Sequence, residues 1–193
     1  MGNVITDRKE IDYALKHIAE SNLAAHGNVW LEHRRGGKVL YSGDQGKNTF
    51  TTEGMANILN VYFGATAKSA VIYCGLFKNN VSPALADTAA AKLGAAGSYG
   101  ECQDADYDSP LTNRATYTIA ATTSAVATNA AAKAEFTMAN ASTITLYGAF
   151  LATAAAKTAT TGTLVCAKKF TTARAVEDND EISIGYVITL TTS

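Results

Sequence analysis

The sequence lacks the features that mark several common classes of protein. Its 193 residues carry 16 Lys and Arg against 17 Asp and Glu, for a net charge of −1, so there is no basic stripe of the kind that binds nucleic acid. No apolar run approaches the roughly 18 residues of a membrane span, and the N-terminus has no apolar signal-peptide core. We therefore expect no nucleic-acid partner, no membrane partner and synthesis in a cytoplasm.

Cysteine and proline are also scarce. The three cysteines, Cys74, Cys102 and Cys166, are odd in number and form no C-x-x-C pair, so they indicate reduced thiols and not a disulfide framework or a zinc site. None of the three histidines stands beside another ligand at metal-binding spacing. With only two prolines, the turns depend mostly on glycine. We expect no cofactor and no structural metal.

Motifs for ion or phosphate binding are incomplete. The stretch GDQGKNT (43–49) lacks the first glycine and the final Ser or Thr of a phosphate-binding loop. In DADYDS (104–109), Asp104, Asp106 and Asp108 alternate as in the first half of a calcium loop, but Ser109 and Ala115 stand where the turn Gly and the bidentate Glu belong. The stretch indicates a solvated acidic loop, with a weak cation site as the alternative.

Catalytic sets are missing too. A glycan hydrolase would need two carboxylates that face each other across a cleft, and Glu101 and Asp106 are the only nearby candidates, both in a loop. No Ser/His/Asp set is suggested by the spacing. We predict that the protein is not an enzyme.

What the sequence does contain is a series of strand-like segments. The last, EISIGYVITL, alternates strictly between the two sides of a strand. Five such segments in about eighty residues, separated by Ala/Thr/Gly turns, predict a mainly β fold, an antiparallel β-sandwich of jelly-roll-like type with one or two short helices. We expect the final strand to close a sheet built from residue 114 onward. The segments are RATYTI (114–119), KAEFTM (133–138), STITLYGAFLAT (142–153), TLVCAKKF (163–170) and EISIGYVITL (181–190).

The middle of the chain contributes one helix, one strand and a long loop. TTEGMANILNVYF (51–63) has helical spacing, with Thr51 or Thr52 as the N-cap; Met55, Ile58, Leu59 and Tyr62 share a face. The apolar run AVIYCGLF (70–77) predicts a buried strand in the same core. Residues 78–113 are irregular, which is typical of a functional or partly disordered loop.

The first 48 residues are expected to form an N-terminal arm separate from a β-sandwich domain of residues 49–193. DRKEIDYALKHIAES, from residue 7 to about residue 22, predicts an amphipathic helix, because Ile11, Leu15 and Ile18 recur at helical spacing. The segments before and after Gly36-Gly37 then predict a β-hairpin with a two-residue turn.

Between about residues 50 and 190, short motifs follow one another in a definite order. In the motifs below, h stands for an apolar residue and x for any residue. They are G-h-N-x-h-L-x-x-x-F, Y-x-G-L, ALADT, Y-x-E…Y with a following Arg, h-x-G-A-F-L, T-G-T-L-h-x-A-x-x-F and V-x-x-x-D-x-h-x-h-x-Y-x-h. In this order they resemble a group of small tailed-bacteriophage virion proteins, often encoded near the major capsid protein gene. The matching residues are Gly54, Met55, Asn57, Ile58, Leu59, Phe63, Tyr73, Gly75, Leu76, Ala84–Thr88, Tyr99, Glu101, Tyr107, Arg114, Leu146, Gly148–Leu151, Thr161–Val165, Ala167, Phe170, Val176, Asp180, Ile182, Ile184, Tyr186 and Ile188. The acidic turn EDND departs from the Gly-Asp typical of the group, and residues 1–48 look like an addition.

The resemblance implies a capsid decoration or cement protein that binds the exterior of the virion head and bridges neighbouring capsid subunits. Its partners would be the major capsid protein and further copies of itself, as a dimer or trimer. The alternative is a tail or baseplate structural or adhesion protein, in which loop 78–113, with Tyr99 and Tyr107, would be the recognition surface. The residues expected to contact the capsid are Arg8, Lys9, Lys16, Trp30, Arg34 and Arg35.

Overall fold

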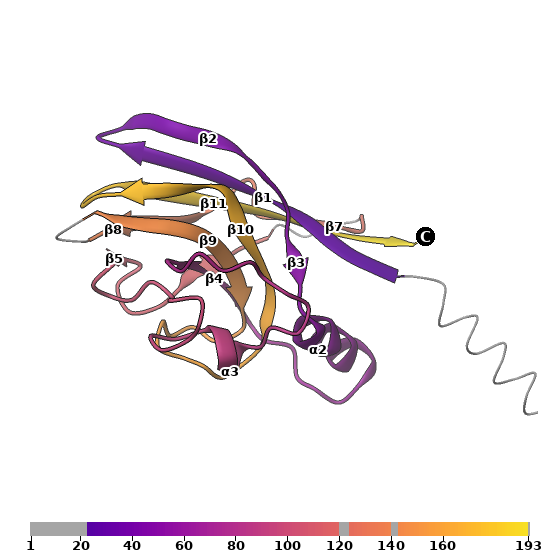
Figure 1. Ribbon diagram of the computed structural model, residues 1–193. Helices are drawn as coiled ribbons and strands as arrows, with labels where there is room; N and C mark the ends of the chain where they lie inside the picture. The colour runs from indigo at the N-terminus through magenta and orange to yellow at the C-terminus, as the bar shows by residue number, and fades with distance from the viewer. Residues whose placement is uncertain (1–22, 120–123, 140–142, 193) are drawn as a thin grey trace, which may run out of the picture.

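The computed structural model describes residues 23–119, 124–139 and 143–192, which form two antiparallel sheets packed face to face (Figure 1). The expected mainly β, antiparallel sandwich is confirmed. The predicted helix at residues 7–22, with Arg8, Lys9 and Lys16, lies outside the described residues.

The six-stranded sheet, here called sheet A, has the order β2-β1-β11-β8-β5, and β7 also pairs with β11. Its strands are β1 (Leu23–Arg35), β2 (Lys38–Lys47), β5 (Tyr107–Ser109), β7 (Val126–Thr128), β8 (Ala134–Met138) and β11 (Glu181–Thr192).

The five-stranded sheet, sheet B, has the order β3-β10-β9-β4-β6. Its strands are β3 (Thr49–Phe50), β4 (Ile72–Phe77), β6 (Ala115–Tyr117), β9 (Ile144–Ala152) and β10 (Leu164–Val176). Two helices complete the described fold, α2 (Thr52–Phe63) and α3 (Ala89–Lys92).

The final strand pairs mainly with the first described one. β11 runs antiparallel to β1 in an unbroken register, from Leu23 opposite Thr192 to Arg34 opposite Glu181. The expectation that β11 closes a sheet built only from residue 114 onward is therefore corrected. β8 and β7 cover its other edge, while β6, β9 and β10 belong to sheet B.

The same pairing corrects the division of the chain at residue 48. The predicted hairpin is present, and Gly36 and Gly37 have φ values of 55° and 76°, as a primed two-residue turn requires. Its first strand, however, buries Val29 and Leu31 completely in the core. β1 and β2 therefore belong to the sandwich and are not part of a detachable arm.

The core lies between the sheets. Along β1 and β11 every second side chain points inward, which places Val29, Leu31, Ile184 and Tyr186 in one cluster with residues of sheet B. The members from sheet B include Cys74, Leu76, Leu146, Leu151 and Cys166. All three cysteines are free and buried, as expected of reduced thiols. Burial raises the pKa of each thiol, that of Cys166 to about 12.

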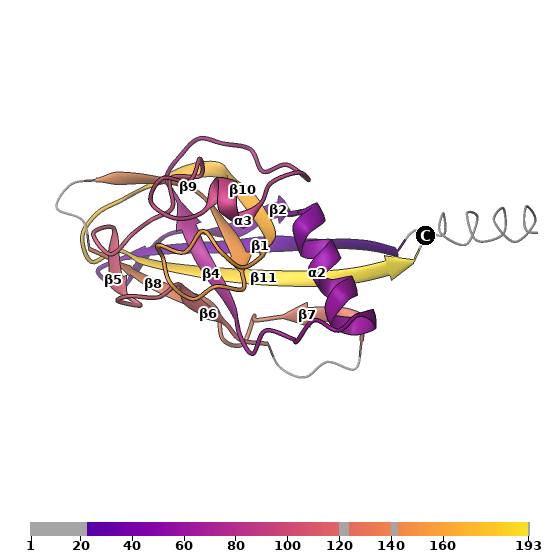
Figure 2. The same ribbon diagram turned by 90° about the horizontal axis from the view of Figure 1, so that it is seen from below.

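Helix α2 is attached to the sandwich by its first turn. Thr51 is the N-cap and accepts a hydrogen bond from the Gly54 N–H at 2.9 Å, which confirms the first of the two predicted caps. The Glu53 carboxylate accepts hydrogen bonds from the Ala89 and Leu164 N–H groups at 2.9 and 2.7 Å. Gly54 is the one buried residue of this helix as described, and the helix lies across β1 and β11 (Figure 2) with much of its surface exposed.

Candidate functional site

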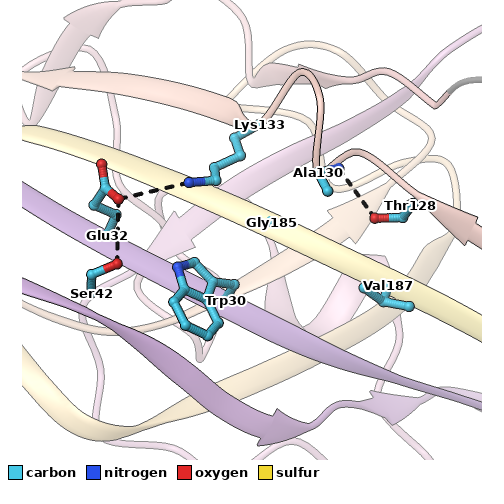
Figure 3. Close-up of a pocket in the computed structure, with 8 residues that line it drawn as sticks. All are labelled: Trp30, Glu32, Ser42, Thr128, Ala130, Lys133, Gly185 and Val187. Atoms are coloured by element: carbon cyan, nitrogen blue, oxygen red, sulfur yellow. Dashed lines mark hydrogen bonds and ion pairs between the residues drawn. The ribbon is translucent and has the colours of Figure 1, made fainter.

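The outer face of sheet A, which points away from sheet B, carries a hollow of about 430 Å³ (Figure 3). It lies over the strands β1, β2 and β11 and is closed on one side by the turn between β7 and β8. The residues that line it are Trp30, Glu32, Ser42, Thr128, Ala130, Lys133, Gly185 and Val187. We call this surface the Trp30 hollow.

The hollow exists because a large residue faces the smallest one across two strands. Trp30 on β1 is the register partner of Gly185 on β11, and both positions face away from the core. Gly185 supplies no side chain above the sheet, so the indole is flanked by open space and stays 42% exposed. A Cβ atom at Gly185 would lie 3.4 Å from the Cβ of Trp30, so the space could hold a side chain.

One wall of the hollow is held by Asn129. β8 pairs with β11 up to Ile184 and β7 pairs from Val187 onward; the buried Asn129 side chain bridges this gap. Its Nδ2 donates to the Ile184 carbonyl at 3.1 Å, and its Oδ1 accepts from the Tyr186 N–H at 2.7 Å. The turn is thereby fixed to β11, and its residues Ala130 and Lys133 line the hollow together with the indole (Figure 3).

The charge in the hollow is balanced around Glu32. Its carboxylate accepts a 2.6 Å hydrogen bond from Arg34 Nε and one of 3.3 Å from the Ser42 hydroxyl, and it lies 3.8 Å from Lys133 Nζ. The bond from Arg34 lowers the pKa of Glu32. The hollow therefore combines an apolar ring face with a fixed carboxylate and a half-exposed ammonium. This combination suits either a side chain of a partner protein or a sugar ring.

The predicted contact residues of the hairpin do not all reach this surface. Trp30 forms its centre, and Arg34 is joined to it through Glu32. Arg35 binds Asp180, with Nε and Nη2 at 2.7 and 2.8 Å from the two carboxylate oxygens. Asp180 also accepts a hydrogen bond from the buried His33 Nε2 at 2.8 Å. Arg35 therefore stabilises the turn between β10 and β11, in which Asp180 lies.

The carboxylates considered for catalysis are engaged in ion pairs inside the protein. Glu101 receives two hydrogen bonds from Arg114, at 2.6 and 2.9 Å, and both side chains are fully buried. Arg114 also donates to the carbonyls of Ala154 and Ala159. Burial raises the pKa of Glu101, and Arg114 opposes that rise. This pair joins the loop after β4 to the loop after β9.

The acidic stretch 104–109 is tied down by two lysines. Asp106 lies 2.7 Å from Lys78 Nζ and accepts from the Gln103 N–H, while Asp104 lies 3.1 Å from Lys157 Nζ. The buried Lys157 donates to the carbonyls of Tyr107 and Leu111 as well, and burial lowers its pKa. Within the described ranges, no group of three or more His, Cys, Asp or Glu residues could hold a metal ion.

The same loop does not offer its tyrosines to a partner. Tyr99 and Tyr107 are both fully buried; Tyr99 stacks on Phe77 and Tyr107 packs edge-on against Phe136. The expectation that these tyrosines form a recognition surface is therefore corrected, because loop 78–113 uses them to complete the core.

Several residues of the hollow were not predicted. Lys133 and Thr128 come from segments far from Trp30 in the sequence, and β7 is only three residues long. Gly185 carried a weak signal, since a glycine on the outer side of a strand leaves a gap that a neighbouring aromatic residue can flank.

Comparison with protein-family models, with curated proteins and with solved structures gives no match for this chain. In the part of the chain that the structure describes, no helix is long and apolar enough to cross a bilayer.

Proposed function

We propose that the protein is a structural virion protein of a tailed bacteriophage that binds the exterior of the head and stabilises it by bridging neighbouring capsid subunits. The proposal rests on the order of sequence motifs from residue 50 to residue 190 and on one structural observation. That observation is the half-exposed indole of Trp30 in a hollow on the outer face of sheet A. Tryptophan is the residue most enriched where binding energy concentrates in protein interfaces.

The outer face of sheet A has the size that a stable interface needs. The strands β2, β1, β11, β8 and β7 have 10, 13, 12, 5 and 3 residues. At about 3.3 Å per residue along a strand and about 4.8 Å between strands, they cover about 680 Å², within the roughly 600–1,000 Å² that each partner contributes to a standard protein–protein interface. The partners in this proposal are the major capsid protein and further copies of this chain, arranged around a two-fold or three-fold axis.

The test is to add the purified protein to phage heads assembled without it. Bound copies are counted after sedimentation, and the temperature at which the heads release their genome is recorded. Wild-type protein should bind and raise that temperature. Trp30→Ala should weaken binding by about 30-fold, as expected for a central interface residue worth about 2 kcal/mol. Leu85→Ala removes an even more exposed apolar side chain, beside α2, and should bind as wild type. Equal binding by Trp30→Ala would reject this face as the contact.

The second candidate is a tail or baseplate protein that adheres to the host surface. The observation that favours it is the composition of the same hollow, where the indole face adjoins the Glu32 carboxylate and the Ser42 and Thr128 hydroxyls. Sugar rings stack on such faces while their hydroxyls bond to nearby oxygens. Saturable binding of host surface polysaccharide, lost in Trp30→Ala, together with no binding to heads, would favour this role.

A further inference from the structure

Helix α2 presents an apolar stripe that the described residues do not cover. Tyr62 and Phe63 are 80% and 79% exposed, and Leu59 is 51% exposed. The stripe borders an apolar groove of about 180 Å³, lined by Ala25, Met55, Ile58, Leu59 and Leu190. A contiguous exposed apolar surface of this kind marks an interaction site.

The groove continues the core of the sandwich beyond its end. The inward-facing residues of β11 are fully buried up to Tyr186, but Ile188 is only half-buried and Leu190 is 37% exposed. Ala25, the register partner of Leu190, lies beside it. Figure 2 shows α2 crossing below the ends of β1 and β11, where the chain enters the first strand and leaves the last.

We propose that residues 7–18 of the same chain, within the helix predicted from the sequence, fill this groove, with Ile11, Leu15 and Ile18 packed against α2. The two surfaces match in length. Ile18 follows Ile11 by seven positions, and Tyr62 follows Met55 by seven positions, so each stripe is about two turns, or about 10.5 Å, long. Each segment is too short to be a stable helix alone, and each has one apolar face that needs a partner.

The position of the segment in the chain favours docking in the groove of the same chain over docking in the groove of another copy. Leu23 begins β1, and Ala25, two residues later, already lines the groove. Only residues 19–22 lie between Ile18 and β1, and four residues reach at most about 14 Å. A tether this short raises the effective concentration of the segment at its own groove to the millimolar range. The groove is on the inner side of sheet A, so this docking is independent of the Trp30 hollow and of the proposed virion role.

The first test is thiol protection in the full-length protein. Leu59→Cys places one thiol in the groove, whereas the three native cysteines are fully buried. A maleimide should label this thiol at least ten-fold faster when Ile11→Asp and Leu15→Asp are also present, because the charged residues displace the segment. Equal labelling rates would overturn the proposal. The urea unfolding curves monitored at Trp30 should start from the same folded baseline, which establishes that the folded sandwich is compared in both cases. The midpoint should be lower for the variant with Ile11→Asp and Leu15→Asp, because the docked segment no longer stabilises the folded state.

The second test is cross-linking at dilute protein concentration. Leu15→Cys combined with Leu59→Cys should give a disulfide within one chain, seen as a monomer of altered mobility on a non-reducing gel. A covalent dimer would show that the groove takes the segment of another copy and would overturn the assignment to the same chain. Leu15→Cys with Ala130→Cys, whose second thiol is on the opposite face of sheet A, is the matched control and should give no cross-link within one chain. A rapid cross-link in this control pair would overturn the proposal, since the segment would then have no fixed place.

Discussion

Trp30 lies directly opposite Gly185 on the neighbouring strand, and the side chain that Gly185 lacks is what leaves the indole accessible. The pair sits on the outer face of a sheet whose inner face is core. Changes at either position can therefore alter the hollow without disturbing the residues that hold the sandwich together.

Gly185→Val should occupy the part of the hollow beside the indole and leave the fold intact. A Cβ atom there meets no atom closer than 3.4 Å, and a β-branched residue suits a strand better than glycine, so the free energy of unfolding should stay equal or rise by about 0.5–1 kcal/mol. Binding to heads should fall as in Trp30→Ala. Urea denaturation and the sedimentation assay measure the two effects, and a stable Gly185→Val that binds normally would place the contact elsewhere.

Gly54→Ala should destabilise the protein although alanine is the better helix former. A Cβ atom at position 54 would lie 2.2 Å from the Val165 carbonyl oxygen of β10, so α2 would have to move away from sheet B. We expect the free energy of unfolding to fall by about 1–3 kcal/mol, whereas helix propensity alone would raise it by about 1 kcal/mol. Asn60→Ala, at an exposed position of the same helix, should change stability by less than about 0.5 kcal/mol. A stabilised Gly54→Ala would contradict the close packing.

Asp180→Asn should destabilise the protein in a pH-dependent way. Burial alone would raise the pKa of Asp180, but hydrogen bonds from Arg35, the Glu177 N–H and His33 hold it at about 2, below the ordinary 3.8. Since the folded-state pKa is depressed, the contribution is full above the unfolded pKa and disappears as the pH falls through about 2.

The difference between the folded and unfolded pKa of Asp180 corresponds to about 2 kcal/mol of the free energy of unfolding at pH 7. Urea denaturation of wild type and Asp180→Asn should therefore show a gap that narrows steadily between pH 4 and pH 2. Asp178→Asn, an exposed neighbour in the same turn, should show almost none. A gap of constant size down to pH 2 would contradict the charged network.

Arg114→Met should be among the most damaging single substitutions in the loops. It leaves the buried Glu101 carboxylate without its partner and frees the carbonyls of Ala154 and Ala159, at a cost of about 3–5 kcal/mol. Glu101→Gln should cost less because the amide still accepts hydrogen bonds. The loss in free energy of unfolding should be smaller for the double variant than the sum of the two single losses, by at least about 1 kcal/mol. Strict additivity in this cycle would mean that the two side chains do not interact.

The sequence predicted local features well. Period-two alternation located β8, β9 and β11, and glycine chemistry located the hairpin turn, because both depend on residues close together in the chain. The N-cap at Thr51 and the helix after it followed from the same short-range rules.

Pairing between distant segments was not predictable in this way. Every potential partner of β11 shows the same alternation, so nothing local selects β1 from the other end of the chain. The ion pair of Arg35 could not be foreseen for the same reason, because its partner Asp180 is 145 residues away. Trp30 was predicted as a contact residue, and the hollow around it depends on the register that places Gly185 opposite and on Asn129, which fixes the wall.

The virion role is tested most directly by quantitative mass spectrometry of purified particles, with this chain measured against the major capsid protein. The proposal predicts a molar ratio near one or a simple fraction of one, because a cement protein occupies repeated positions on the head lattice. A ratio of one copy to several tens of capsid subunits would contradict it and would transfer the Trp30 hollow to a role on the tail.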